Sequence, residues 1–213
     1  MPWEPVATRV IADVETLRAL AEPIRIRILE TMVRDTGEGW TVKRIAKALG
    51  TGPTKLYHHI RILEENDLIR PSGQQLVRGI VETSYRIAQL ELRLDRAFLS
   101  SASEEVRSSA HAALLSVFDL AREDLEAAIR SGLVTHDGAT DEPGAFVLTR
   151  TIIRTTRARS IELREKVLAL FREYETTNET RDETTEVMLG AFLSLHPLPE
   201  IAGAARRGNT EIT

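Results

Sequence analysis

The sequence lacks cysteine, and none of its apolar runs approaches the roughly 18 residues that a membrane-spanning helix needs. Without cysteine, disulfide bonds, thiolate metal sites and cysteine nucleophiles are excluded. The first ten residues, MPWEPVATRV, have neither the basic region nor the hydrophobic stretch of a signal peptide. We therefore expect a cytoplasmic protein with no membrane partner.

Catalytic motifs are missing as well. The sequence contains no GxGxxG, no Walker A run, no HExxH and no GxSxG. None of its five histidines has another histidine three or four residues away, which is the spacing that places two metal ligands on one helix face. We therefore expect no enzymatic activity, no cofactor and no metal site.

Positive charge is scarce overall but concentrated in one region. The chain has 213 residues and a formal net charge of −4. Residues 1–90 carry 13 basic and 11 acidic side chains, whereas residues 91–213 carry 15 and 21. Residues 39–63 contain five basic side chains and no acidic one. An acidic protein needs such a local basic patch if it is to hold nucleic acid.

The basic region has the pattern of two short helices joined by a tight turn. The first helix is predicted from Val42 to Leu49, and Gly50 follows where a left-handed residue ends a helix. Gly52 is placed to cap the second helix, which begins at Pro53 and ends near Asn66. This arrangement is typical of a helix-turn-helix.

The second helix has one apolar face and one polar face. Leu56, Ile60 and Leu63 share a face that must be buried. The remaining polar side chains can donate to phosphates or read base edges in a major groove. Together with residues of the first helix and of a later loop, the candidate DNA-binding residues are Lys43, Arg44, Thr54, Lys55, Tyr57, His58, Arg61 and Arg78. The alternative is an ordinary helical hairpin with a solvated basic face.

The sequence around this motif resembles a known family. ALAEPIRIRILETM at 19–32 is followed by KRIAKALGTGPTKLYHHIRILEENDLI at 43–69 and then by a glycine-containing hairpin. Over residues 13–88, this order and spacing resemble the ArsR-type winged helix-turn-helix transcriptional regulators of bacteria. The resemblance implies a DNA-binding regulator. Two features depart from it: Gly52 stands where the family usually has serine, and the cysteines through which many members sense metals are absent.

The flanking segments predict an α+β fold. Residues 1–11 are expected to form an N-terminal arm, and the wing strands are expected at 68–71 and 79–88, joined by the loop 72–78. Beyond the wing, a smaller strand-helix-strand-helix-strand domain is expected, with its elements at 89–94, 103–131, 146–156, 159–175 and 184–195. The predicted domains are 1–88 for DNA binding, 89–197 for dimerisation or effector binding, and 198–213 as a flexible tail.

The long helix at 103–131 suggests a homodimer. Its apolar stripe is longer than a three-stranded sheet and one shorter helix can cover, so part of it is expected to pair with a second copy. Since cysteine is absent, an effector would be an organic small molecule bound within residues 89–197. The competing hypothesis is that the winged helix is a protein–protein interaction subunit of a larger assembly.

Overall fold

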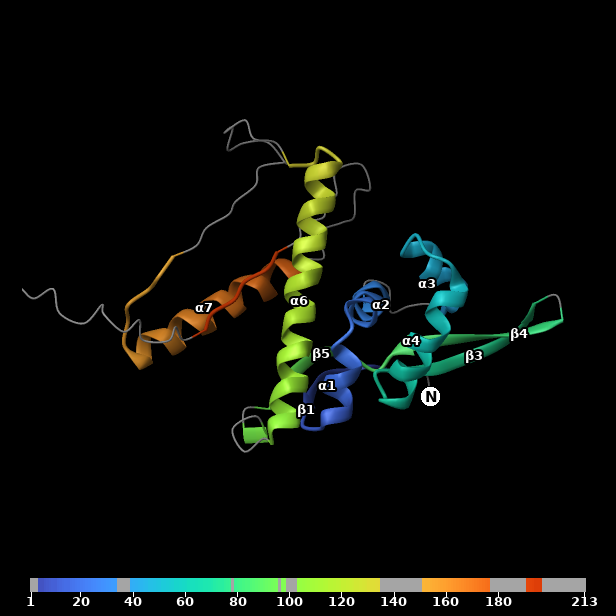
Figure 1. Cartoon of the computed structure of the whole chain (residues 1–213), viewed down its shortest axis with the longest axis horizontal. Coiled ribbons are helices and arrows are strands. Elements are labelled where there is room, and N and C mark those ends of the chain that lie inside the picture. The colour runs from blue at the N-terminus through green and yellow to red at the C-terminus, as the bar shows by residue number, and fades with distance from the viewer. Residues whose placement is uncertain are drawn as a thin grey trace, which may run out of the picture. The chain divides into compact units, whose positions relative to one another are not determined.

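The computed structural model describes residues 4–33, 39–77, 79–95, 97–98, 103–134, 151–176 and 191–196. The chain divides into two compact units, residues 1–127 and residues 128–213, which we describe separately. The fold combines helices with two small sheets, so the predicted α+β class is confirmed (Figure 1).

Four helices form the centre of the first unit. They are α1 (Val14–Leu20), α2 (Pro23–Val33), α3 (Val42–Ala48) and α4 (Pro53–Glu65). Side-chain caps set two of their starts: the Asp13 carboxylate accepts a hydrogen bond from the Thr16 amide at 2.7 Å, and the Thr41 hydroxyl accepts one from the Arg44 amide at 3.2 Å. Each cap satisfies an amide that the helix itself cannot pair.

The turn between α3 and α4 follows the sequence pattern closely. Gly50 has a φ of +62°, a conformation that glycine adopts without steric cost. Gly52 precedes α4 with extended backbone and makes no side-chain cap, and Pro53 is the first helical residue. The helix-turn-helix geometry predicted for this stretch is therefore confirmed.

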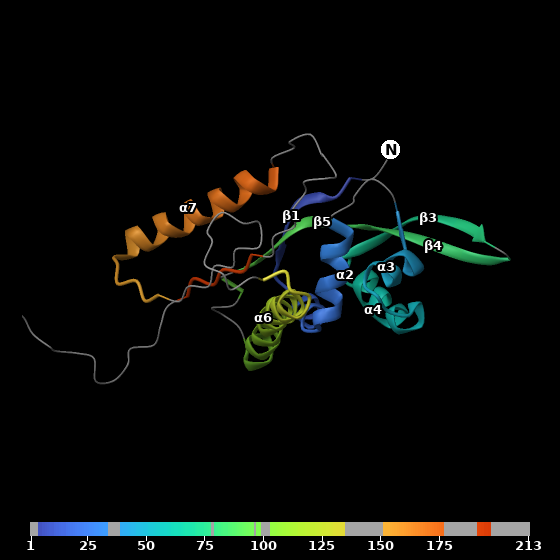
Figure 2. The same cartoon turned by 90° about the horizontal axis from the view of Figure 1, so that it is seen from above.

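A three-stranded antiparallel sheet in the order β2–β4–β3 forms the wing. Its strands are β2 (Trp40–Thr41), β3 (Ile69–Val77) and β4 (Ile80–Ile87). The expected loop 72–78 was wrong, because β3 continues to Val77, which pairs with Ile80. Strand pairing across a short connection satisfies the backbone groups that a loop would have left to water. Figures 1 and 2 both show this hairpin projecting beyond α3 and α4.

The N-terminal segment is also more regular than expected. Residues 6–11 form β1 (Val6–Ile11), which pairs in parallel with β5 (Gln89–Leu94). The sequence predicts only an N-terminal arm here. The segment forms a strand because it pairs with β5. The first paired residues, Val6 and Gln89, are 83 positions apart in the sequence.

The helix α6 (Glu104–Arg130) belongs largely to the first unit. It buries Ala110, Ala113 and Leu120, and its Ser116 hydroxyl donates to the Ala21 carbonyl at the end of α1 at 2.7 Å. We had expected a domain boundary at residue 88, but β5 and most of α6 pack with the N-terminal elements. The division of roles between 1–88 and 89–197 stays a prediction.

The second unit contains α7 (Arg157–Thr176), close to the helix expected at 159–175. The strands expected at 146–156 and 184–195 were wrong where the structure describes them, because 151–156 and 191–195 form no strand. Their β-branched composition favours extended backbone, but a strand also needs a hydrogen-bonded neighbour. Residues 146–150, 184–190 and the tail at 198–213 lie outside the described residues.

The apolar face of α4 lies in the main core. Leu56, Ile60 and Leu63 are at most 2% exposed. They pack with side chains of the other helices and of the wing sheet, among them Leu17, Ile28, Met32, Ile45, Leu68 and Ile87. The face that the sequence predicts to be buried is therefore confirmed.

We expect Leu63→Ala to lower the free energy of unfolding by about 2–5 kcal/mol, because the truncation leaves a cavity in a packed core. Urea denaturation followed by circular dichroism measures this. The matched control is Glu65→Ala, two residues further along α4 at an exposed ion pair with Arg61, which should change stability by about 1 kcal/mol at most. Equal losses in both variants would contradict the packing described for α4.

Candidate nucleic-acid interface

The outward face of α4 is polar and accessible. Five of the predicted residues lie on it and are exposed: Thr54, Lys55, Tyr57, His58 and Arg61. They project from a helix whose opposite face is fixed in the core. The structure therefore brings these five residues together on one surface, and the rigid packing behind them keeps that surface in place.

Arg61 already has partners within its own helix. Its guanidinium lies 3.1 Å from a Glu65 carboxylate oxygen and 3.5 Å from Nδ1 of His58. Both members of the Arg61–Glu65 pair are more than half exposed. An exposed pair of this kind contributes about 0.2–1 kcal/mol, so a phosphate or a base edge can replace Glu65 at little cost.

The two basic residues of α3 are held differently from those of α4. Nζ of Lys43 lies 3.4 Å from the carboxylate of Glu82 in β4, which links α3 to the wing. The Arg44 guanidinium stacks 4.0 Å from the centre of the Trp40 ring and donates to the Gly39 carbonyl at 3.4 Å. Arg44 thus holds β2 against the start of α3, which the sequence did not reveal. Arg78 lies outside the described residues.

Helix dipoles add to the positive character of this surface. In the described first turns of α3 and α4 there is no acidic side chain. The partial positive charge at each helix N-terminus is therefore not neutralised locally, and an anionic group such as a phosphate is favoured there.

His59 lies on the inner side of α4, next to the exposed His58. It is half-buried, and its Nδ1 is buried with no hydrogen-bond partner among the described residues. Burial lowers the pKa of His59, and the positive charge of Arg25 lowers it further, as does His58, while Glu22 acts in the opposite direction. Near neutral pH the imidazole is therefore uncharged and serves as a packed side chain.

The C-terminal end of α4 is held by groups from outside the helix-turn-helix. The carbonyls of Asn66 and Asp67 accept hydrogen bonds from Nη1 of Arg9 in β1, at 2.8 and 3.1 Å. The Leu68 carbonyl accepts two, from the Ala88 amide at 3.0 Å and from Nε2 of Gln89 at 3.1 Å.

Sequence reasoning missed these contacts at the end of α4. The segment VATRVI is rich in β-branched residues, which favour a strand, but nothing in the sequence indicates which residues Arg9 meets.

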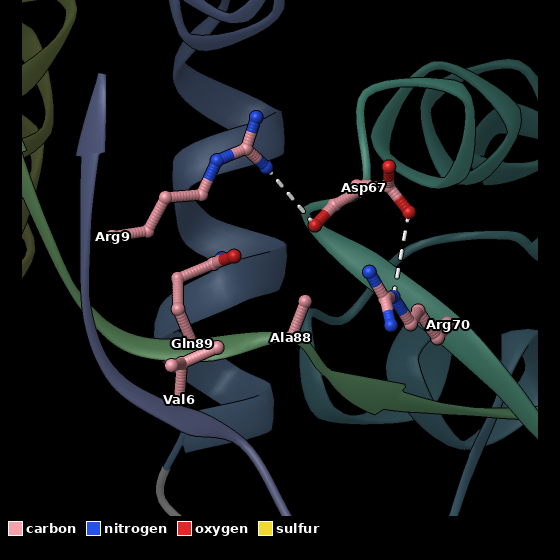
Figure 3. Close-up of a pocket in the computed structure, with 6 residues that line it drawn as sticks. All are labelled: Val6, Arg9, Asp67, Arg70, Ala88 and Gln89. Atoms are coloured by element: carbon pink, nitrogen blue, oxygen red, sulfur yellow. Dashed lines mark hydrogen bonds and ion pairs between the residues drawn. The ribbon is translucent and has the colours of Figure 1, made fainter. Parts of the chain in front are cut away.

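A small pocket lies beside these contacts. Its volume is about 240 Å³, and its lining residues are Val6, Arg9, Asp67, Arg70, Ala88 and Gln89. Figure 3 shows the Arg9 guanidinium reaching the Asp67 carbonyl on one side, and Arg70 facing the Asp67 carboxylate on the other. Only Gln89 belongs to the range 89–197 in which an effector was expected.

The described part of the chain contains no cluster of three or more histidine, aspartate or glutamate side chains able to hold a metal ion. None of the helices described combines the length and the apolar character needed to cross a membrane.

A family model described as "Helix-turn-helix domain" matches residues 20–71. Residues 20–71 form a helix-turn-helix domain. This range holds α2, β2, α3 and α4 and the first residues of β3. It therefore includes the polar face of α4 but excludes β1, β5 and α6.

The remaining comparisons give little more. No curated protein matches the chain. Among solved structures, one described as "Possible transcriptional regulator from Methanosarcina mazei Go1" is 14% identical, with 51% of this chain and 81% of that chain covered. Its TM-score is 0.30, which is too low to support an argument.

The lowered pKa of His59 predicts a pH-dependent stability. Well above pH 6.5, the ordinary pKa of histidine, the imidazole is neutral in both folded and unfolded chains, so the full stability is present. As the pH falls, the unfolded chain binds the proton first, and stability is lost down to the lower folded-state pKa. We expect His59→Gln to lose less unfolding free energy than the wild type between about pH 7.5 and pH 5.5. Urea titrations at both pH values measure this; identical pH dependence in the two proteins would contradict it.

Proposed function

We propose that this protein is a sequence-specific, DNA-binding transcriptional regulator of the ArsR type. In this proposal it acts in the cytoplasm as a homodimer and inserts α4 into the major groove. The observation that carries the proposal is the polar face of α4, with Lys55, Arg61 and three further hydrogen-bonding side chains held outward by a buried apolar face.

The dimensions of the surface suit a duplex. The 13 residues of α4 make a helix of about 20 Å, and the major groove is wide enough to admit one. The projecting β3–β4 hairpin supports a second contact beside α4, where Gln74, Gln75 and Arg78 are the candidates for the DNA backbone or the minor groove. Of these, both glutamines are exposed in the structure.

The distribution of charge supports the same function. The chain as a whole is acidic, so attraction to DNA depends on the basic stretch at 39–63. Contacts between basic side chains and phosphates release counterions, which makes affinity fall as salt rises. A protein–protein interaction subunit, the competing hypothesis, would show no such dependence on a DNA duplex.

Features of α6 support the homodimer. Leu114 and Phe118 are 52% and 44% exposed, and with Leu125 they lie within about 40° on the helical wheel. This stripe lies about 120° around the helix from Ala113 and Leu120, which face the core. A second copy related by a two-fold axis would cover the stripe and present two copies of α4 to a palindrome.

Regulation would follow from a ligand. We propose that an effector of this protein is organic, because cysteine is absent from the sequence, and that it binds within residues 89–197. The identity of the operator would come from sequencing the DNA fragments that the protein selects from a random pool.

Arg61→Ala should reduce specific DNA binding by about 1–3 kcal/mol if Arg61 contacts a base. If it contacts only phosphate, the loss should be similar for all sequences, and the slope of log affinity against log salt should shrink by about one. Gel-shift titrations at two salt concentrations, with the selected site and a scrambled site, distinguish these outcomes.

The matched control is Glu65→Gln, which removes the partner of Arg61 but leaves the guanidinium in place. It should bind DNA at least as tightly as the wild type. An Arg61→Ala protein that binds its site normally at every salt concentration would exclude Arg61 from the interface.

Leu114→Glu should convert the dimer to monomers and weaken operator binding, because the substitution buries a carboxylate in the apolar stripe of α6. Light scattering measures the mass, and circular dichroism checks that the helices persist. Ser108→Glu is the control, since Ser108 is exposed on the same helix about 120° away from Leu114. A wild-type protein that stays monomeric at tens of micromolar yet binds its site tightly would refute the dimer.

A further inference from the structure

The C-terminal end of α4 is fixed by a long-range contact that the helix-turn-helix alone does not contain. We propose that Arg9 of β1 is a positioning residue for α4. Strand β1 then contributes to DNA recognition by fixing the orientation of the polar face of α4. The inference rests on the proposed function, in which α4 enters the major groove. Arg9 touches no DNA in this proposal; it acts through α4.

The first step is the state of the helix end. The last carbonyls of α4 are paired locally: those of Ile62, Leu63 and Glu64 accept hydrogen bonds from the amides of Asn66, Leu68 and Asp67 at 3.2, 2.9 and 3.0 Å. What remains to be fixed is the segment Asn66–Leu68 that carries these amides. After α4, Asp67 takes a φ of +54°, which turns the chain toward β3. The carbonyls of the three successive residues Asn66, Asp67 and Leu68 then face β1 and the β4–β5 junction, and all three accept hydrogen bonds from there.

The second step is the nature of the donors. One nitrogen of Arg9, Nη1, serves two of the three carbonyls, and it carries positive charge at the negative end of the helix dipole. Charge-assisted hydrogen bonds are roughly twice as strong as neutral ones. Arg9 therefore provides the charge-assisted contacts among those that hold the segment after α4.

The third step is that Arg9 is itself held. Its other nitrogen, Nη2, donates to the Thr16 hydroxyl of α1 at 3.1 Å and lies 3.8 Å from the Asp13 carboxylate. Its backbone is fixed by the register of β1 against β5, in which Arg9 pairs with Leu92. The guanidinium thus joins three elements, β1, α1 and α4, and its side chain is only 27% exposed.

The consequence concerns geometry more than folding. Arg9 is not part of the apolar core that buries Leu56, Ile60 and Leu63, so we expect its removal to leave that core intact. What changes is the fixed position of the last turn, and with it the direction in which Arg61 and its neighbours project. Base reading depends on that direction, whereas loose attraction to phosphates does not.

The experiment compares Arg9→Ala, Arg9→Lys and the control Arg93→Ala. Arg93 is an arginine of β5 whose guanidinium contacts Glu91 at 2.9 Å. Two readouts are taken on the full chain: hydrogen exchange of the amides at 66–68, and gel-shift affinities for the selected site and for a scrambled duplex.

We expect Arg9→Ala to exchange faster at 66–68 and to lose about tenfold in affinity for the selected site, with little change on the scrambled duplex and an unchanged salt slope. Arg9→Lys should recover part of the loss, because an ammonium supplies charge without the planar fork of the guanidinium. Arg93→Ala should match the wild type in both readouts.

Other outcomes would overturn the proposal. Equal losses on both duplexes with a salt slope smaller by about one would make Arg9 a phosphate contact. Unchanged exchange at 66–68 in both Arg9 variants would show that Arg9 does not hold α4. If the wild type selects no DNA site, the proposed function fails, and the exchange measurement still decides whether Arg9 holds the helix. If Arg9→Ala unfolds, Arg9→Lys supplies the same comparisons.

Discussion

The burial of one face of α4 is the interaction on which the rest of the first unit depends. Leu56, Ile60 and Leu63 pack against α2, α3 and the base of the wing sheet. Helix geometry then places the polar residues between them on the opposite, solvent-facing side. A helix with a fully buried stripe cannot rotate about its axis without exposing that stripe to water, so the direction of its polar face is set by the hydrophobic effect. Hydrogen bonds to the residues that follow it, Asn66 to Leu68, then limit how far it can tilt.

The parts of this structure that could be predicted from the sequence are those decided by neighbouring residues. Helical periodicity, the glycine turn at Gly50 and the proline at the start of α4 all act within a few positions, and each lies where the sequence predicts it. The exposure of Thr54, Lys55, Tyr57, His58 and Arg61 followed directly from the spacing of the buried residues.

The parts that could not be predicted depend on distant partners. The pairing of β1 with β5 and the contact of Arg9 with α4 join residues 57 or more positions apart, so no local pattern records them. The same reason explains why a strand that the sequence predicts is absent from the structure. Residues 151–156 are rich in isoleucine and threonine, yet they form no strand. Their high β-propensity favours extended backbone, but a strand also needs a hydrogen-bonded neighbouring strand. Likewise, Arg44 had the charge of a DNA contact, and only the structure revealed that Trp40 lies beneath it.

The parallel pairing of β1 and β5 has a consequence for synthesis of the chain. Strand β1 leaves the ribosome before α1 to α4 and the wing, but its partner begins only at Gln89, so β1 stays unpaired while these elements emerge. Local helices form quickly, whereas the pairing of β1 with β5 must first overcome the entropic cost of closing the long loop between them. The helix-turn-helix therefore takes shape before its last turn is secured, and the reading surface reaches its final geometry only when the chain has been made past residue 95.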